Sequence, residues 1–250
     1  MNLKRKIVIP FLSLFLLTNL NANEKIDSFS KAKKLMKKVY KENQVTFYSN
    51  CKYNYRDKSN MILRDSCGYE PRNEYTKKGK KNQRATRIEW EHVIPAENFG
   101  RQFVCWREGN STCVKDNGKT YKGRKCCSFV DEKFRFMEAD MHNLVPAIGE
   151  LNADRSNFRY GIIEGEKRLY GQNIDFEVDF KNRIAEPADN IKGNIARTYF
   201  YFEKQYGMKI SNKDKKLFNA WNNLDPVDDW ERKRNNLIYK IQGNKNPFIN

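Results

Sequence analysis

The stretch RIEWEHVIPAENFG, residues 87–100, decides how this fold presents its chemistry. Apolar and polar side chains alternate from Ile88 to Ile94, which is typical of a strand, and Pro95 ends it. An acid and an imidazole, Glu91 and His92, come just before that end. Successive side chains of a strand point to opposite faces, so this pair can reach one ligand only if the strand ends or bends there.

A second stretch, ADMHNLVPAIGELNADRSNF (residues 139–158), carries the only other histidine, His142, with Asn143 directly after it. An acid therefore precedes one histidine and a carboxamide follows the other, a combination that fits a hydrolytic site. Each residue also has a plainer interpretation, Glu91 as a surface acid and Asn143 as the N-cap of a helix.

Hydrolysis of a phosphodiester explains why these residue types would work together. Water must lose a proton near neutral pH, and a histidine with an ordinary pKa of about 6.5 suits that task. One Mg²⁺ can neutralise the charge of the transition state and assist the leaving oxygen, and it prefers carboxylate and carbonyl ligands. Glu91 and the side-chain carbonyl of Asn143 are such ligands, which leaves His92 as the base.

The charge of the chain favours polyanionic partners. Lys and Arg number 48 against 31 Asp and Glu, a formal net charge of +17. Nucleic acid, anionic lipid and acidic cell-wall polymers all qualify, and charge that serves only solubility is the alternative. Lys77 to Lys81 is a short basic run in a polar stretch, where we expect a loop suited to contacting phosphate.

The N-terminus has the layout of a secretory signal peptide. A basic patch at Lys4–Lys6 precedes an apolar run from Ile7 to Leu17, and Ala22 offers a small residue for cleavage. A membrane anchor is the alternative, but this run is shorter than the roughly 20 residues that span a bilayer. We expect removal of residues 1–22, a periplasmic or secreted protein of residues 23–250, and no membrane attachment afterwards.

The cysteines indicate a disulfide-stabilised protein. An even count of six in an exported chain is typical of disulfides, and no zinc-type spacing occurs. Cys51 is expected to pair with Cys67. Because two adjacent cysteines rarely bridge each other, two pairings remain open for the other four, which are Cys105, Cys113, Cys126 and Cys127.

The remaining pattern predicts a single α+β domain that is mixed and rich in helix. No internal repeat or low-complexity linker occurs. Helical spacing covers Lys25–Tyr40 and Asp189–Tyr206, and Ser211 with Asp214 resembles a capping box. A last helix is expected to open at Asp225-Pro226 and close at Gly243.

Five segments resemble the bacterial endonuclease I family of exported and periplasmic nucleases, in the same order over nearly the whole mature chain. The resemblance implies the ββα-metal fold and several disulfides. The matching segments are EWEHVIPAENFG, HNLVPAIGELNADRSNF, ARTYFY (196–201), WNNLDPVDDWE (221–231) and QGNKNPF (242–248).

The resemblance assigns roles to the same three residues. It implies that Glu91 and Asn143 bind one metal ion, Mg²⁺ with Mn²⁺ as a substitute, and that His92 is the general base. Two further residues are expected to support the site without carrying out the reaction, His142 and Asn157.

One feature of the family is missing from this sequence. The resemblance implies an arginine, in the loop after the first motif, that steadies the cleaved phosphate, yet residues 110–113 contain none. Arg101, Arg107 and Arg155 are the candidates. A structural pairing of Arg155 with Glu150 or Asp154 is the alternative for the last of these.

The function we expect is sequence-nonspecific hydrolysis of double- and single-stranded DNA, and of RNA, by a monomer. Nothing resembles a base-reading helix, so binding should use the phosphate backbone. By resemblance, the products carry 5′-phosphate ends. A non-catalytic nucleic-acid binder of DNA uptake is the alternative. A cell-wall hydrolase lacks a convincing ligand set or carboxylate pair.

Overall fold

A computed structural model describes residues 26–55, 60–165 and 167–250 of this chain. The expected signal peptide lies outside these residues. Within them, no helix is both long and apolar enough to cross a bilayer.

The centre of the molecule is an antiparallel strand pair followed by a helix. Strand β3 (Ile88–His92) pairs with β4 (Leu144–Ile148), and Glu91 lies opposite Val145. All five residues of β4 are buried, and the chain passes from β4 directly into α6 (Gly149–Arg155). This ββα unit confirms the expected α+β class and brings the two sequence motifs side by side.

Strand β3 ends at His92, two residues before the predicted end. The Val93 amide still donates to the Asn143 carbonyl at 3.0 Å, but the Ile94 amide donates to the Asn143 side chain at 2.7 Å. The Asn143 side chain thus bonds the backbone just beyond the last residue of the ladder. The strand stops where Glu91 and His92 stand.

Two smaller sheets flank this unit. In the larger, β7 (Ile184–Pro187) pairs in parallel with β5 (Arg159–Tyr160) and antiparallel with β6 (Phe176–Asp179). In the smaller, β1 (Tyr53–Asn54) pairs with β2 (Met61–Ile62).

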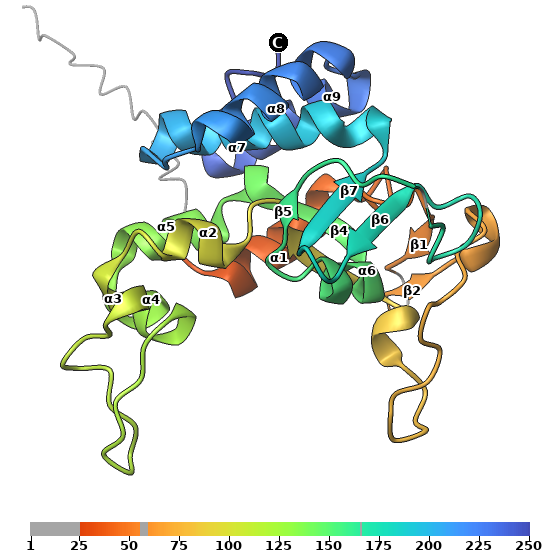
Figure 1. The fold of residues 1–250 in the computed structure, drawn as a ribbon. Helices are drawn as coiled ribbons and strands as arrows, with labels where there is room; N and C mark the ends of the chain where they lie inside the picture. The colour runs from red at the N-terminus through yellow and green to blue at the C-terminus, as the bar shows by residue number, and fades with distance from the viewer. Residues whose placement is uncertain (1–25, 56–59, 166) are drawn as a thin grey trace, which may run out of the picture.

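Three long helices form a layer on one side of the molecule (Figure 1). They are α7 (Lys192–Tyr206), α8 (Asn212–Leu224) and α9 (Asp229–Gln242). Gly207 ends α7 in the left-handed conformation at φ +69°. Ser211 caps α8 as predicted, by accepting from the Asp214 amide at 3.1 Å.

The predicted start of the last helix was wrong. Helix α9 begins at Asp229 and is capped by Asp228, whose side chain accepts from the Glu231 amide at 2.7 Å. Asp225 serves another element, because its carboxylate accepts from the Gly193 amide at 2.8 Å, in the first turn of α7.

The rest of the helical content is short. The N-terminal helix, expected over Lys25–Tyr40, is α1 (Phe29–Val39), capped by Ser28. The other elements are α2 (Ala96–Gly100), α3 (Val104–Arg107), α4 (Arg124–Val130), α5 (Glu132–Ala139) and the 3₁₀ turns η1 (Arg64–Ser66), η2 (Gln83–Ala85), η3 (Met141–Asn143) and η4 (Asp189–Ile191).

All six cysteines form disulfides. Cys51 pairs with Cys67 as expected, and the open choice resolves to Cys105–Cys127 and Cys113–Cys126. The last two bridges tie α3 and the following loop to α4.

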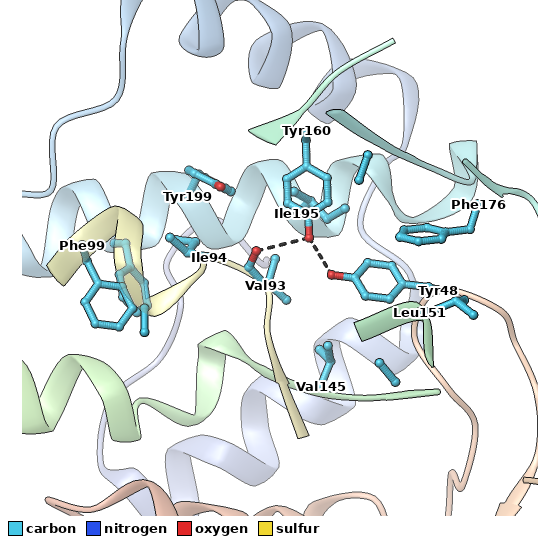
Figure 2. Packing of buried hydrophobic residues seen from close by; sticks show 14 of the residues in the cluster. Tyr48, Val93, Ile94, Phe99, Val145, Leu151, Tyr160, Phe176, Ile195 and Tyr199 are labelled. Atoms are coloured by element: carbon cyan, nitrogen blue, oxygen red, sulfur yellow. Dashed lines mark hydrogen bonds between the residues drawn. The ribbon is translucent and has the colours of Figure 1, made fainter. Parts of the chain in front are cut away.

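The core reaches the end of β3 directly. The Tyr160 hydroxyl lies 2.6 Å from the Tyr48 hydroxyl and donates to the Val93 carbonyl at 3.2 Å, between α7 and the strand end (Figure 2). Because these groups are buried, the hydrogen bonds fix the chain immediately after His92.

Candidate active site

A cleft of about 620 Å³ opens where β3 ends. Its lining combines the two residues of the first motif, Glu91 and His92, with Phe29 and Lys33 of α1. The lining also includes Gln83, Arg84, Arg87, Glu89, Arg124 and Asn152. Four basic side chains against two acids give the cleft a positive charge suited to an anion.

Glu91 is a buried carboxylate at the edge of this cleft. Its Oε1 accepts from Arg155 at 3.1 Å, and the residue is 5% exposed. Burial raises the pKa of Glu91 to about 7, against the opposing charge of Arg155. A second cation would stabilise the ionised form further.

His92 is held in one tautomer. Its Nε2 lies 2.8 Å from the Glu138 carbonyl, which can only accept, so Nε2 carries the proton and Nδ1 keeps a lone pair. Nδ1 makes no hydrogen bond within the described residues. Burial, helped by the charge of Arg124, lowers the pKa of His92 to about 3 and keeps the ring neutral at pH 7. Phe29 packs against the ring at 4.6 Å.

Asn143 does not fit the metal-binding role predicted for it. Its Oδ1 accepts from the Ile94 amide at 2.7 Å, and its Nδ2 donates to the Ile94 carbonyl at 3.0 Å. The side chain is fully buried, and it does not line the cleft. Both polar groups are committed to the backbone, so Asn143 shapes the end of β3.

A different carboxamide, Asn152, does line the cleft. It lies in α6, and its Nδ2 donates to Glu89 at 3.1 Å. That contact turns the carbonyl oxygen away from Glu89, and this oxygen accepts no hydrogen bond within the described residues. Asn152 was not among the residues predicted for the site, although it lies in the second motif and its helix follows β4 directly.

The donors of the cleft suit a hard cation. A buried carboxylate on Glu91 and an unengaged carbonyl on Asn152 are oxygen ligands, and Mg²⁺ takes few protein ligands while keeping several waters. Among the described residues, no cluster of three or more His, Cys, Asp or Glu side chains could hold a metal. Glu91 and Asn152 are the cleft residues whose oxygen donors are of the type that Mg²⁺ accepts.

None of the three arginines proposed from the sequence lines the cleft. Arg101 pairs with Glu97, and the Arg107 guanidinium donates to the Arg101 carbonyl at 2.7 Å. Arg155 is 1% exposed and pairs with Glu91, so the alternative pairing with Glu150 or Asp154 was wrong. It also donates to the His92 carbonyl at 3.2 Å and thus holds the strand end.

Arg124, which sequence reasoning missed, brings its guanidinium to the cleft. Its Nε pairs with Oε1 of Glu138, the residue whose carbonyl accepts from His92. The guanidinium lies over Phe29 at 5.2 Å, and its side chain is 43% exposed. Its terminal nitrogens make no hydrogen bond within the described residues, so they remain available for an anion.

The two supporting residues lie away from the cleft. His142 is buried, its Nε2 lies 3.1 Å from the Asn244 carbonyl, and its ring packs on Tyr201. Asn157 bridges Glu97 and Arg183. His142 fits the structural role favoured from the sequence.

Comparison with known proteins identifies the family of the chain. The Endonuclease I family model matches residues 21–250. An extracellular deoxyribonuclease of Aeromonas hydrophila is 43% identical, with 96% of each chain covered. A periplasmic deoxyribonuclease of the same species is 42% identical over 98% of this chain and 96% of its own. An extracellular ribonuclease of Bacillus subtilis (strain 168) is 33% identical over 44% of this chain and 43% of its own. The chain therefore belongs to the endonuclease I family.

Proposed function

We propose that this protein is a periplasmic or secreted, Mg²⁺-dependent endonuclease that hydrolyses phosphodiester bonds of DNA and RNA without sequence specificity. The observation that carries the proposal is the state of His92, which lines a positively charged cleft and whose proton lies on Nε2, so that Nδ1 keeps its lone pair. The names of the relatives supply the substrates and the location: deoxyribonucleases, a ribonuclease, and the words extracellular and periplasmic.

We propose Glu91 and Asn152 as the protein ligands of the metal ion, which Mn²⁺ can replace. When bound, the ion would neutralise charge on the scissile phosphate and assist departure of the 3′ oxygen. Arg155 holds Glu91 at 3.1 Å, and Glu89 orients the Asn152 amide at 3.1 Å. The two ligands are thus set before substrate binds.

His92 accepts the proton of the attacking water on Nδ1. The Glu138 carbonyl keeps Nε2 protonated, so the imidazolium that forms is stabilised by the same 2.8 Å hydrogen bond. The pKa of His92 is low in the free protein, about 3. The negative charge of a bound phosphodiester acts in the opposite direction and raises the pKa of His92, which favours proton transfer to it.

Arg124 takes the role of the phosphate-binding arginine. Its guanidinium is anchored through Nε by Glu138 and offers its terminal N–H groups to a phosphate oxygen. Ser128 fixes the other oxygen of Glu138 at 3.0 Å, so the anchor is itself positioned. Glu138 therefore orients the base through its backbone and the arginine through its side chain.

The test is plasmid cleavage by purified protein with and without EDTA. We expect nicked and linear products carrying 5′-phosphate ends in Mg²⁺, and intact plasmid in excess EDTA. A non-catalytic binder would bind the plasmid and leave it uncut under both conditions. Robust cleavage in EDTA would place the protein in a metal-independent class.

A further inference from the structure

Two basic hairpins lie beside the cleft, and neither has a role in the proposed hydrolysis of the phosphodiester. The first hairpin spans residues 74–82. Its turn closes with the Thr76 amide donating to the Lys80 carbonyl at 2.8 Å, and Gly79 supplies the positive φ of +70° that this turn needs. Four exposed lysines and no acid occupy residues 75–81: Lys77, Lys78, Lys80 and Lys81.

The second hairpin spans residues 113–122 and has the same turn. The Lys115 amide donates to the Lys119 carbonyl at 2.9 Å, and Gly118 has a φ of +76°. Its three lysines, with one aspartate between them, are exposed: Lys115, Lys119 and Lys122.

Both hairpins are fixed at their roots to the elements that build the site. At the first root, the Asn73 amide donates to Oε1 of Glu150 at 2.8 Å, and Glu150 belongs to α6, the helix of Asn152. At the second root, Cys113 is bridged to Cys126 in α4, the helix that begins with Arg124. The lysines of both hairpins are therefore held in a fixed position relative to the site.

The cleft lies between these two roots. Gln83 and Arg84, which directly follow the first hairpin, line one part of it, and Arg124, just after the second hairpin, lines another. Both hairpins project from the same side of the molecule, away from the layer of α7, α8 and α9 (Figure 1). A ligand in the cleft would thus have a basic arm on each side.

We infer that the two hairpins form a clamp for double-stranded DNA, gripping the backbone on both sides of the scissile phosphate. This inference rests on the proposed nuclease function and names the form of substrate that the site favours. Lysine charges separated by a catalytic cleft match a rigid partner with regularly spaced phosphates. Duplex DNA carries one charge per roughly 1.7 Å of axis and stays stiff over about 150 base pairs. A flexible single strand must be ordered to reach both arms.

The test compares three triple variants of the full mature protein. The first hairpin variant is Lys77→Gln, Lys78→Gln and Lys80→Gln, and the second is Lys115→Gln, Lys119→Gln and Lys122→Gln. The matched control is Lys209→Gln, Lys213→Gln and Lys216→Gln, three exposed lysines in or beside α8, in the layer opposite the hairpins. Binding of a 20-base-pair duplex and of its single strand is measured by fluorescence anisotropy in EDTA, so that the nucleic acid is not cleaved during the measurement.

We expect the Kd for the duplex to rise about ten-fold or more in each hairpin variant, with a salt slope smaller by about one for each lost phosphate contact. The single strand should lose less, and the control should bind as the wild type does. A dinucleotide has no phosphate beyond the one that is cleaved, so it cannot contact the hairpins. Its cleavage in Mg²⁺ by the two hairpin variants should therefore be unchanged. Equal losses for duplex and single strand, or wild-type duplex binding by both hairpin variants, would overturn the clamp. The binding assay does not depend on cleavage. Failure of the wild type to cut DNA would therefore count against the nuclease function and not against the clamp.

Discussion

The Nε2 atom of His92 lies 2.8 Å from the carbonyl oxygen of Glu138, and this hydrogen bond determines which ring nitrogen is free to act as a base. Glu138 also anchors Arg124 through its carboxylate. One residue of α5 therefore aligns the proposed base and the proposed phosphate ligand, although the base lies 46 residues before it in the sequence.

Replacement of the base should separate catalysis from binding. We expect His92→Ala to lower the cleavage rate by about 10²- to 10⁴-fold, the usual effect of losing a general base. Duplex binding in EDTA should stay within about two-fold of wild type, because backbone recognition rests on many Lys and Arg side chains. Single-turnover cleavage and anisotropy measure the two effects, and near wild-type turnover would exclude His92 as the base.

Asn143 should matter for stability. In Asn143→Ala the amide and carbonyl of Ile94 lose their partners while staying buried, which costs about 1–3 kcal/mol for each group. Urea unfolding should therefore show a loss of about 2–5 kcal/mol. Asn152→Ala, at the edge of the cleft, should unfold within about 1 kcal/mol of wild type. Equal stability of Asn143→Ala and wild type would contradict the structural role.

Arg124 should affect both rate and pH dependence. Loss of a preorganised donor to the reacting phosphate lowers kcat by about 10²-fold, which we expect for Arg124→Gln, with partial recovery in Arg124→Lys. Because the charge of Arg124 lowers the pKa of His92, its removal should move the acid limb of kcat/KM to higher pH at saturating Mg²⁺. Arg107→Gln, outside the cleft, is the matched control. A lower kcat with an unmoved acid limb would argue that Arg124 only supports the structure.

The disulfide at the root of the second hairpin should contribute measurable stability. Removing Cys113–Cys126 by two Cys→Ser changes should cost about 3 kcal/mol, as expected for a loop of this length. The native protein should contain no titratable thiol, since all six cysteines are paired. Six reactive thiols in the oxidised native protein would exclude this disulfide pattern.

The sequence was sufficient to place Glu91 and His92 at a strand end, but it did not show that the Asn143 side chain bonds the backbone of Ile94. Alternation and Pro95 placed Glu91 and His92 at a strand end, and they do line the cleft. Asn143 and Asn152 stand in the same motif, and spacing alone cannot say which amide faces a strand backbone and which faces the cleft. Only the register of β4 against β3 settles that question, because it brings Asn143 beside Ile94.

The arginine was missed for a related reason. Arg101 and Arg107 follow the first motif closely in the chain, whereas Arg124 comes after the second hairpin, inside the loops that the disulfides Cys105–Cys127 and Cys113–Cys126 close. Arg124 is held at the cleft by Glu138 and Phe29, and such contacts between distant segments produce no pattern in the sequence.

In the proposed site, Glu91 and Asn152 hold a single metal ion beside His92. The most direct test of these two ligands is titration with Mn²⁺, followed by electron paramagnetic resonance, of wild type, Glu91→Gln, Asn152→Ala and Asn143→Gln, with circular dichroism to verify folding. We predict one Mn²⁺ per wild-type chain, a loss of at least about ten-fold in affinity and of nearly all cleavage in Glu91→Gln and Asn152→Ala, and retained metal affinity in folded Asn143→Gln. The opposite result would contradict Asn152 as a metal ligand: folded Asn152→Ala with wild-type Mn²⁺ affinity and cleavage, and folded Asn143→Gln without Mn²⁺ affinity or cleavage.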